Sequence, residues 1–438
     1  MEFVISRNTL LRALQHARCA IRKGELDVFK NLVMTFPDDP KEATMTIHAS
    51  DGSMWITETV PLDRPVTVPG SSAALDPSDT VPGDSVAGTK PRPIAVWYSD
   101  LLRPLKSLDE QPLLFIVGEY QLTVRHTCGS FRLPLSNRAG EFLQTPCPRP
   151  DAEATDGYSF DYEAPGLRSI LSHCSFAMAN DELRPAMNGV YMNLTEKFAD
   201  YVSSDGHRLV RVRKRPVCCR TAATALSASL ILPAPVVRTL LKVLPSTGDV
   251  VVEYQKEKTK ECDSPGKQGK VTVIERKAMV RIIINDTLTI SFCPIDGRYP
   301  AYWSVIPEDS TFKMTVERRT LTKSVDRLAI FQPSSGLVEL NVSKDNLRLN
   351  AENYDFSMSG EEDIACTTVK TDGTALPPDY FLRIGLKAPT LSQTLKALTS
   401  ESVEFLLLDP TRAIIIHPVP QPDVEDITML LMPMLIND

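Results

Sequence analysis

The stretch LLRPLKSL, residues 101–108, recurs in altered form at two later points of the 438-residue chain, as VRTLLKVL (237–244) and LSQTLKAL (391–398). In each copy apolar residues fall at offsets 0, 4 and 7, which is the spacing of one face of an α-helix. A lysine stands at the same place in every copy, and a strand-like apolar run follows each after a short break (PLLFIV, DVVVEY, VEFLLL). The sequence therefore predicts a threefold internal repeat.

A second helical pattern precedes each of these copies. It begins at Leu10, Leu167 and Leu321 and again places apolar residues at offsets 0, 4 and 7. Between the helices, alternating or short apolar runs such as ATMTIHAS and GVYMNLT predict strands. Each repeat is thus an α+β unit of several strands and two short helices. The expected domains span residues 1–150, 151–308 and 309–438.

Two segments interrupt the repeat. Residues 64–93 are rich in Pro, Gly and Ser and show no periodicity, which predicts a disordered loop inserted in the first domain. Residues 256–270 form a smaller polar insert in the middle domain.

The composition is that of an ordinary globular protein, with 42% apolar and 24% charged residues. No apolar run is long enough for a membrane span, and the N-terminus lacks the apolar core of a signal peptide, so we expect a cytoplasmic protein without a membrane partner. The nine cysteines include no Cys-x-x-Cys pair, and the six histidines never fall at metal-ligand spacing. These patterns predict reduced thiols, no metal site and no cofactor.

The charge of the chain is unevenly distributed. The net charge of −7 by itself argues against a nucleic-acid partner, but the six helical windows carry +13, which leaves −20 for the remainder. One basic helix is usually a solvated face, whereas six helices of the same sign predict a surface that binds DNA phosphates without reading bases. The candidates from charge and helix position are Arg12, Arg18, Arg238, Lys242 and Lys396.

The stretch YVSSDGHRLVRVRKRP, residues 201–216, places Asp205, Gly206, His207 and Arg208 side by side. A hydrolase could use Asp205 and His207, but such a site needs a nucleophile in a recognisable context, and no Gly-x-Ser-x-Gly elbow is present. Glycine after aspartate instead predicts a tight turn, which could hold a partner-binding pocket. The basic residues that follow, Arg211, Arg213, Lys214 and Arg215, are expected to be a solvated strand end.

In order along the chain, MNGVYMNL with SSDGHRLVRV, then IDGRYPAYWSVIP, then LLMPMLIND resemble the β sliding clamp family of bacterial DNA polymerase III. The resemblance covers the chain apart from the two inserts, and the Asn-Asp tail is most similar to clamps of Bacteroidetes-type bacteria. It implies a non-enzymatic homodimer, in which two three-domain subunits close head to tail into a six-domain ring whose helices line a hole for double-stranded DNA. Such a ring tethers the replicative polymerase. A clamp dedicated to a plasmid or phage polymerase is the alternative, and a hydrolase is the third.

The resemblance also implies sites. A groove would receive short peptides of polymerases, the clamp loader and repair proteins, Lys23 with Arg22 would touch DNA from a loop, and three apolar residues would form the ring joint: Phe142, Ile330 and Phe331. Ser304 and Leu435 stand where family members carry basic residues, so peptide preference near them is expected to differ. The groove residues are Met187, Ser204, Gly206, His207, Arg208, Leu209, Pro300, Val305, Thr411, Ala413, Leu430, Met432, Pro433 and Met434.

Overall fold

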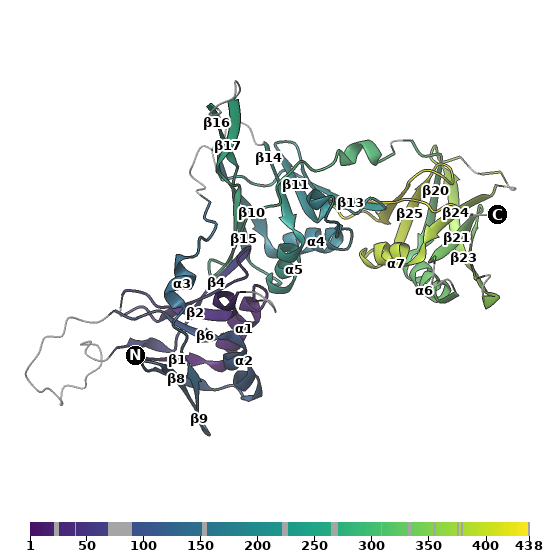
Figure 1. Cartoon of the computed structure of the whole chain (residues 1–438). Coiled ribbons are helices and arrows are strands. Elements are labelled where there is room, and N and C mark those ends of the chain that lie inside the picture. The colour runs from purple at the N-terminus through teal and green to yellow at the C-terminus, as the bar shows by residue number, and fades with distance from the viewer. Residues whose placement is uncertain are drawn as a thin grey trace, which may run out of the picture. The chain divides into compact units, whose positions relative to one another are not determined.

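A computed structural model of the chain shows how these elements are arranged (Figure 1). The described part of the chain forms two compact units, one made of Met1–Ala164 with Lys242–Cys293 and the other of Pro165–Leu241 with Pro294–Asp438. The structure describes residues 1–21, 26–39, 41–68, 90–150, 156–220, 227–263, 270–307, 309–331, 335–353, 356–374, 376–377 and 380–436.

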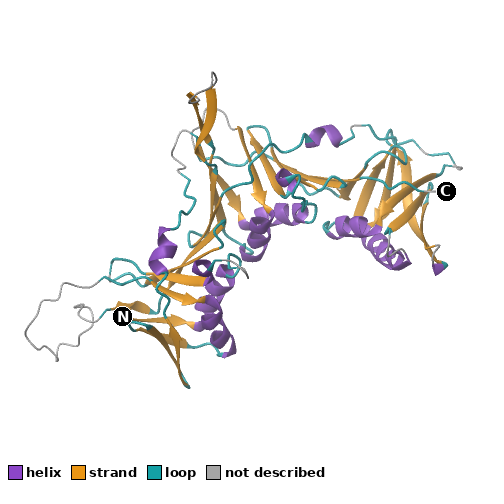
Figure 2. Cartoon of the chain, in the orientation of Figure 1, coloured by secondary structure: helices purple, strands orange, loops and turns teal. Residues whose placement is uncertain are grey.

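All six predicted helices are present, and the apolar residues at the repeated offsets are buried in the core, apart from the half-buried Leu108 and Leu241. Burial of these residues explains why each amphipathic segment folds as a helix against its sheet. Figure 2 shows the six predicted helices on one side of the strands within each unit. The helices are α1 (Arg7–Ala17), α2 (Tyr98–Ser107), α4 (Ala164–Ser175), α5 (Ala234–Val243), α6 (Arg318–Leu328) and α7 (Ala388–Lys396), with an unpredicted short α3 (Ala139–Gln144).

The first unit contains two antiparallel sheets and a separate hairpin. The five-stranded sheet has the order β5 (Arg64–Thr67), β1 (Glu2–Ser6), β7 (Pro112–Val117), β8 (Gln121–His126) and β9 (Gly129–Pro134). The eight-stranded sheet has the order β10 (Gly157–Glu163), β15 (Asp249–Gln255), β18 (Met279–Ile284), β19 (Leu288–Phe292), β4 (Met54–Pro61), β3 (Thr44–Ser50), β2 (Asn31–Thr35) and β6 (Ile94–Trp97). The hairpin pairs β16 (Lys258–Asp263) with β17 (Lys270–Arg276).

The second unit is built on one antiparallel sheet of 12 strands. Its middle joins the second and third repeats, because β13 pairs with β27 in a register that sets Arg208 opposite Leu431 and Leu209 opposite Leu430. The order is β14 (Ser227–Pro233), β11 (Gly189–Thr195), β12 (Ala199–Ser204), β13 (Arg208–Lys214), β27 (Glu425–Leu431), β26 (Ile414–Val419), β25 (Ser402–Leu407), β20 (Phe312–Glu317), β23 (Met358–Lys370), β22 (Asn346–Asn353), β21 (Leu337–Val342) and β24 (Leu382–Lys387).

The two compact units divide the chain differently from the three repeats. The middle repeat contributes to both, because β19 pairs with β4 of the first repeat while β13 pairs with β27 of the third. The three domain boundaries remain a prediction from the repeat.

The two inserts also differ from a simple loop. Arg64–Thr67 at the start of the first insert form β5, which pairs with β1, so the predicted disordered loop is wrong for these residues. Residues 69–89 lie outside the described part of the chain, as do residues 264–269 of the second insert. The described flanks of the second insert form the β16–β17 hairpin.

None of the helices in the described part of the chain is long and apolar enough to cross a membrane. Each cysteine whose side chain the structure describes is a free thiol. Within the same residues there is no cluster of three His, Cys, Asp or Glu side chains that could hold a metal ion.

Candidate functional site: a cavity beside the Asp205–Arg208 turn

The stretch Asp205–Arg208 forms a tight turn between β12 and β13. One carboxylate oxygen of Asp205 accepts hydrogen bonds from the backbone N–H groups of His207 (2.9 Å) and Arg208 (3.0 Å). The other carboxylate oxygen accepts from Nε of Arg208 at 2.9 Å. Gly206 has a φ of 91°, a region that glycine enters without steric cost. The predicted turn is present, and both carboxylate oxygens of Asp205 accept hydrogen bonds that stabilise it.

The hydrogen bonds of this turn give no support to a hydrolase. The buried Ser203 hydroxyl donates to the carbonyl oxygen of Cys174 at 2.6 Å, and the Ser204 hydroxyl donates to the carbonyl oxygen of Arg208 at 2.8 Å. Among the described hydrogen bonds, neither hydroxyl reaches the ring of His207. The paired nucleophile and base that such chemistry requires are therefore missing at this turn.

A cavity of about 440 Å³ lies beside the turn. One wall is the segment after β27, which is pinned by two backbone hydrogen bonds: Met432 N–H donates to His207 (2.9 Å), and Met434 N–H donates to Gly385 (2.8 Å). Glycine is needed at 385, because a Cβ there would lie 2.8 Å from the Met434 carbonyl oxygen. The predicted groove residues that line the cavity are His207, Arg208, Met432, Pro433 and Met434.

The side chain of Arg208 is held in place from three sides. Besides its ion pair with Asp205, it donates from a terminal nitrogen to Oε1 of Gln393 at 2.5 Å. Its guanidinium also lies over the ring of Phe176, 5.1 Å from the ring centroid. Arg208 is therefore a fixed part of the cavity wall, with its charge already neutralised by a carboxylate.

Three other predicted groove residues, Leu209, Leu430 and Ala413, belong to a separate apolar cluster with Tyr299 and Tyr302. Successive side chains of a strand point to opposite faces of the sheet. Leu209 and Leu430, which are paired in the register, therefore face away from the side onto which Arg208 and Leu431 project. Eight of the predicted groove residues thus fall into two groups, five in the cavity lining and three in this apolar cluster, which we call the outer cluster.

The remaining predicted groove residues lie outside the cavity lining. Met187 is buried at the end of the short helix η2 (Pro185–Met187), and the Thr411 hydroxyl donates to Asp409 at 2.6 Å in an exposed turn. Pro300 and Val305 are exposed in the segment that carries η3 (Tyr302–Val305). Ser204 and Gly206 shape the turn itself, with the Gly206 N–H donating to the Ser204 hydroxyl at 3.2 Å.

The expectation of a solvated strand end after the turn is wrong for β13. Arg213 forms a two-pronged ion pair with the fully buried Asp200, from Nε at 2.7 Å and a terminal nitrogen at 2.8 Å. The Tyr302 hydroxyl donates to the same carboxylate at 2.7 Å. Arg211 pairs with a carboxylate of the partner strand β27 at 3.0 Å, and Lys214 with another at 3.1 Å. These cations are therefore structural, because they compensate acidic residues of β12 and β27.

Sequence reasoning missed one entire wall of the cavity. This wall is the junction of β24 and α7, and it comes close to the turn only through tertiary folding. The repeated helix pattern predicted α7 to be one of the DNA-facing helices. The proline in its first turn indicated only where the helix begins. The missed lining residues of this wall are Leu386, Lys387, Pro389, Thr390 and Gln393, and Leu431 of β27 was missed as well.

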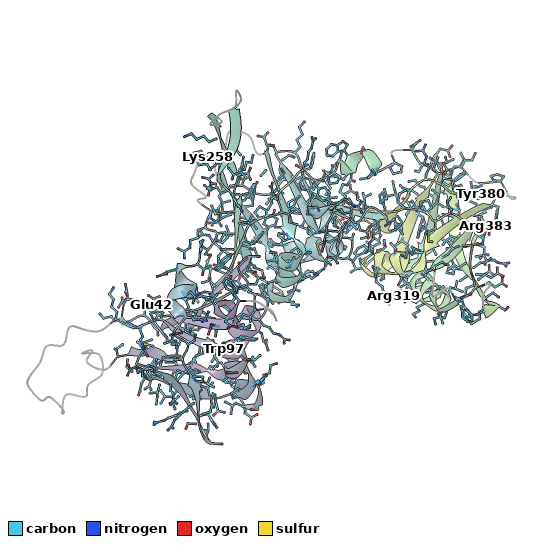
Figure 3. The ribbon with its side chains drawn as sticks, in the orientation of Figure 1. Glu42, Trp97, Lys258, Arg319, Tyr380 and Arg383 are labelled. Atoms are coloured by element: carbon cyan, nitrogen blue, oxygen red, sulfur yellow. The ribbon has the colours of Figure 1, made fainter. Side chains whose placement is uncertain are left out.

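The predicted DNA-facing cations have different environments. Arg12, Arg18, Arg238 and Lys242 are exposed on α1, at its end, and on α5. Lys396 on α7 instead pairs with Asp326 of α6 at 2.9 Å, so its charge is partly neutralised. Figure 3 shows Arg319, an exposed arginine that was not predicted, in the first turn of α6. Two predicted contacts, Arg22 and Lys23, lie outside the described residues.

The three predicted ring-joint residues also differ. Phe142 is only 3% exposed and packs with Val28 and Phe29 in the core of its own unit, and its part in a ring joint stays a prediction. Ile330 in η4 (Ala329–Phe331) is 70% exposed. Phe331 is half-buried, and its ring lies 3.0 Å from where a Cβ on Gly360 would stand.

Comparison with known proteins places this fold among the sliding clamps. The crystal structure of the DNA polymerase III subunit beta from Pseudomonas aeruginosa matches with a TM-score of 0.77 at 20% identity, covering 100% of both chains. A sliding clamp from Bartonella birtlesii matches with a TM-score of 0.75 at 20% identity and the same coverage. In sequence, the beta sliding clamp of Rickettsia felis is 23% identical over 427 residues, 95% of each chain.

Two protein-family models identify the family itself. The model described as "DNA polymerase III beta subunit, central domain" matches residues 163–301, and the one described as "DNA polymerase III beta subunit, C-terminal domain" matches residues 303–434. Together they span more than half of the chain. The chain therefore belongs to the DNA polymerase III beta subunit family.

Proposed function

We propose that this chain is a sliding clamp: two copies close head to tail into a ring around double-stranded DNA and tether the replicative polymerase for processive synthesis. The observation that carries the proposal is the charge of the repeated helices. Arg12, Arg18 and Arg238 are exposed on them, although the chain as a whole has a net charge of −7. Such cations neutralise phosphates without reading bases, as a protein that slides along DNA requires.

We further propose that partner proteins insert short peptides into the cavity beside the Asp205–Arg208 turn. Its wall contains Met432, Pro433 and Met434, and methionine gives an adaptable apolar surface suited to several related peptides. The outer cluster around Leu209 and Leu430 would extend the same binding surface. The expected partners are the polymerase, the clamp loader and repair proteins, all meeting the clamp in the cytoplasm.

In this function the chain needs no catalytic residue and no cofactor. The hydrogen bonds of the Asp205–Arg208 turn hold a backbone conformation, which suits a binding wall better than a hydrolase. Nothing in the fold or site favours a clamp that serves only a plasmid or phage polymerase.

Topological retention on DNA tests the ring. The protein is loaded onto a nicked circular plasmid by its clamp loader with ATP, and gel filtration measures how much stays with the DNA before and after one restriction cut. We expect retention on the circle and rapid loss after linearisation. Equal loss from both would refute the clamp, as would a mass of 48.5 kDa rather than twice that value by light scattering at micromolar concentration.

Peptide binding tests the groove separately. We expect His207→Ala combined with truncation after Leu431 to abolish binding of a polymerase-derived peptide, because the truncation removes Met432–Met434 from the cavity wall. The dimer mass should be unchanged. Unaltered peptide affinity would refute the groove assignment.

A further inference from the structure

Among the described residues that line the cavity beside the Asp205–Arg208 turn, one strong cation has no ion-pair partner. Lys387, the last residue of β24 and the N-cap of α7, lines the cavity and is exposed. In the described part of the chain no carboxylate forms an ion pair with it. The other strong cation of the wall, Arg208, is already paired with Asp205 and bonded to Gln393. An anion entering the cavity would therefore meet Lys387.

Beside polar residues such as Thr390 and Gln393, the cavity lining also contains apolar residues. Met434 is fixed to β24 through its hydrogen bond to Gly385, only two residues before Lys387 along the strand. Met432, Pro433 and Leu386 complete this side of the cavity. An ammonium group beside methionine, proline and leucine suits a chain segment that carries apolar side chains and a carboxylate close together. A nucleic acid would leave these apolar groups without partners.

We propose that the cavity selects peptides with an acidic residue beside their apolar anchors, and that Lys387 is the residue that selects them. This inference rests on the proposed peptide groove and adds the partner's chemistry to it. The first turn of α7 lies in the same wall, so the positive end of the helix adds to the field of Lys387. Arg208 shapes the wall but does not select, because its own carboxylate neutralises it.

A matched peptide series tests this inference. Acetylated and amidated pentapeptides of leucine and serine carry one glutamate, placed in turn at each position, and each has a glutamine counterpart. Fluorescence anisotropy measures their affinity for the full-length chain. At the position that faces Lys387 we expect glutamate to bind about 5- to 10-fold more tightly than glutamine, the size of a partly exposed charge-assisted hydrogen bond. The preference should shrink as salt is raised.

Variants assign the effect to one residue. Lys387→Gln should remove the glutamate preference, so that each glutamate peptide binds no more tightly than its glutamine counterpart. Lys323→Gln, which removes an exposed lysine of α6 away from the cavity lining, should leave the preference intact.

The outcomes separate the two levels of the proposal. Equal affinity of the glutamate and glutamine peptides at every position, or a preference that survives in Lys387→Gln, would overturn the role of Lys387 while leaving the groove. If no peptide binds the wild-type chain, the groove itself is refuted. If Lys387→Gln weakens retention on circular DNA but leaves peptide selection unchanged, Lys387 is a DNA contact instead.

Discussion

The buried carboxylate of Asp200 is expected to hold the outer apolar cluster together. Its side chain is fully buried, and it is compensated by Arg213 on β13 and by the Tyr302 hydroxyl in η3. The Arg213 guanidinium also lies 4.3 Å from the centroid of the Phe198 ring. These contacts connect β12 and β13 to the segment that carries Pro300.

The loss of folding free energy expected for each substitution depends on which buried group is left without a partner. Replacing Arg213 with Met leaves the buried Asp200 carboxylate with one neutral donor, the Tyr302 hydroxyl. Removal of one partner of a buried ion pair costs about 3–5 kcal/mol of folding stability. Asp200→Ala should cost about 3 kcal/mol, at the low end of that range, because the Arg213 side chain is 39% exposed and can regain water. Tyr302→Phe loses the hydrogen bond to the Asp200 carboxylate, worth about 1.5 kcal/mol, together with a longer one that its hydroxyl accepts from Asn193.

Hydrogen–deuterium exchange of the segment 295–306 is the suitable assay, because a chain with two compact units need not unfold in one step. We expect faster exchange in each single variant, in the order of the costs above. The double variant Asp200→Ala with Arg213→Met should cost at least about 2 kcal/mol less than the sum of the two singles. Strict additivity, or an effect of Asp200→Ala below about 1 kcal/mol, would refute this reasoning.

Three further predictions concern other parts of the chain. Burial lowers the pKa of His48 from 6.5 to about 4. The contribution of neutral His48 to stability is therefore complete above pH 6.5 and falls by up to about 3 kcal/mol as the pH approaches 4. His48→Gln should remove this part of the pH dependence in urea titrations, and an unchanged pH dependence would contradict the prediction. Arg238→Ala should reduce the slope of log affinity for DNA against log salt by about 0.9, whereas Lys396→Ala should reduce it less because of the pairing with Asp326; equal reductions would show that the ion pair opens on DNA. Gly206→Ala should destabilise the turn by about 1 kcal/mol or more, since its φ of 91° is strained for alanine, and a thermal midpoint equal to that of the wild type would exclude this.

The turn and one wall of the candidate site could be anticipated from the sequence, but the wall formed by β24 and α7 could not. The Asp-Gly pair predicted the turn because a short carboxylate bonds the backbone two and three residues on, which is a local event. The contribution of Lys387 and Gln393 could not be anticipated, since they lie about 180 residues from the turn and meet it only when β13 pairs with β27. The burial of Phe142 in the core of its unit could not be anticipated either, because an apolar residue looks alike in a sequence whether it faces a partner or its own core.

The sequence by itself determined the threefold repeat, the six helices, the main strands and the basic character of the helices. Each of these depends on spacing over a few residues, where helix and strand periodicity leaves a direct record. The tertiary structure decided which cations are free: Arg238 is exposed, whereas Arg213 compensates a buried carboxylate and Lys396 pairs across two helices. Ion pairing and burial depend on residues far apart in the chain, and only the register of the strands and the packing of the helices bring those residues within bonding distance.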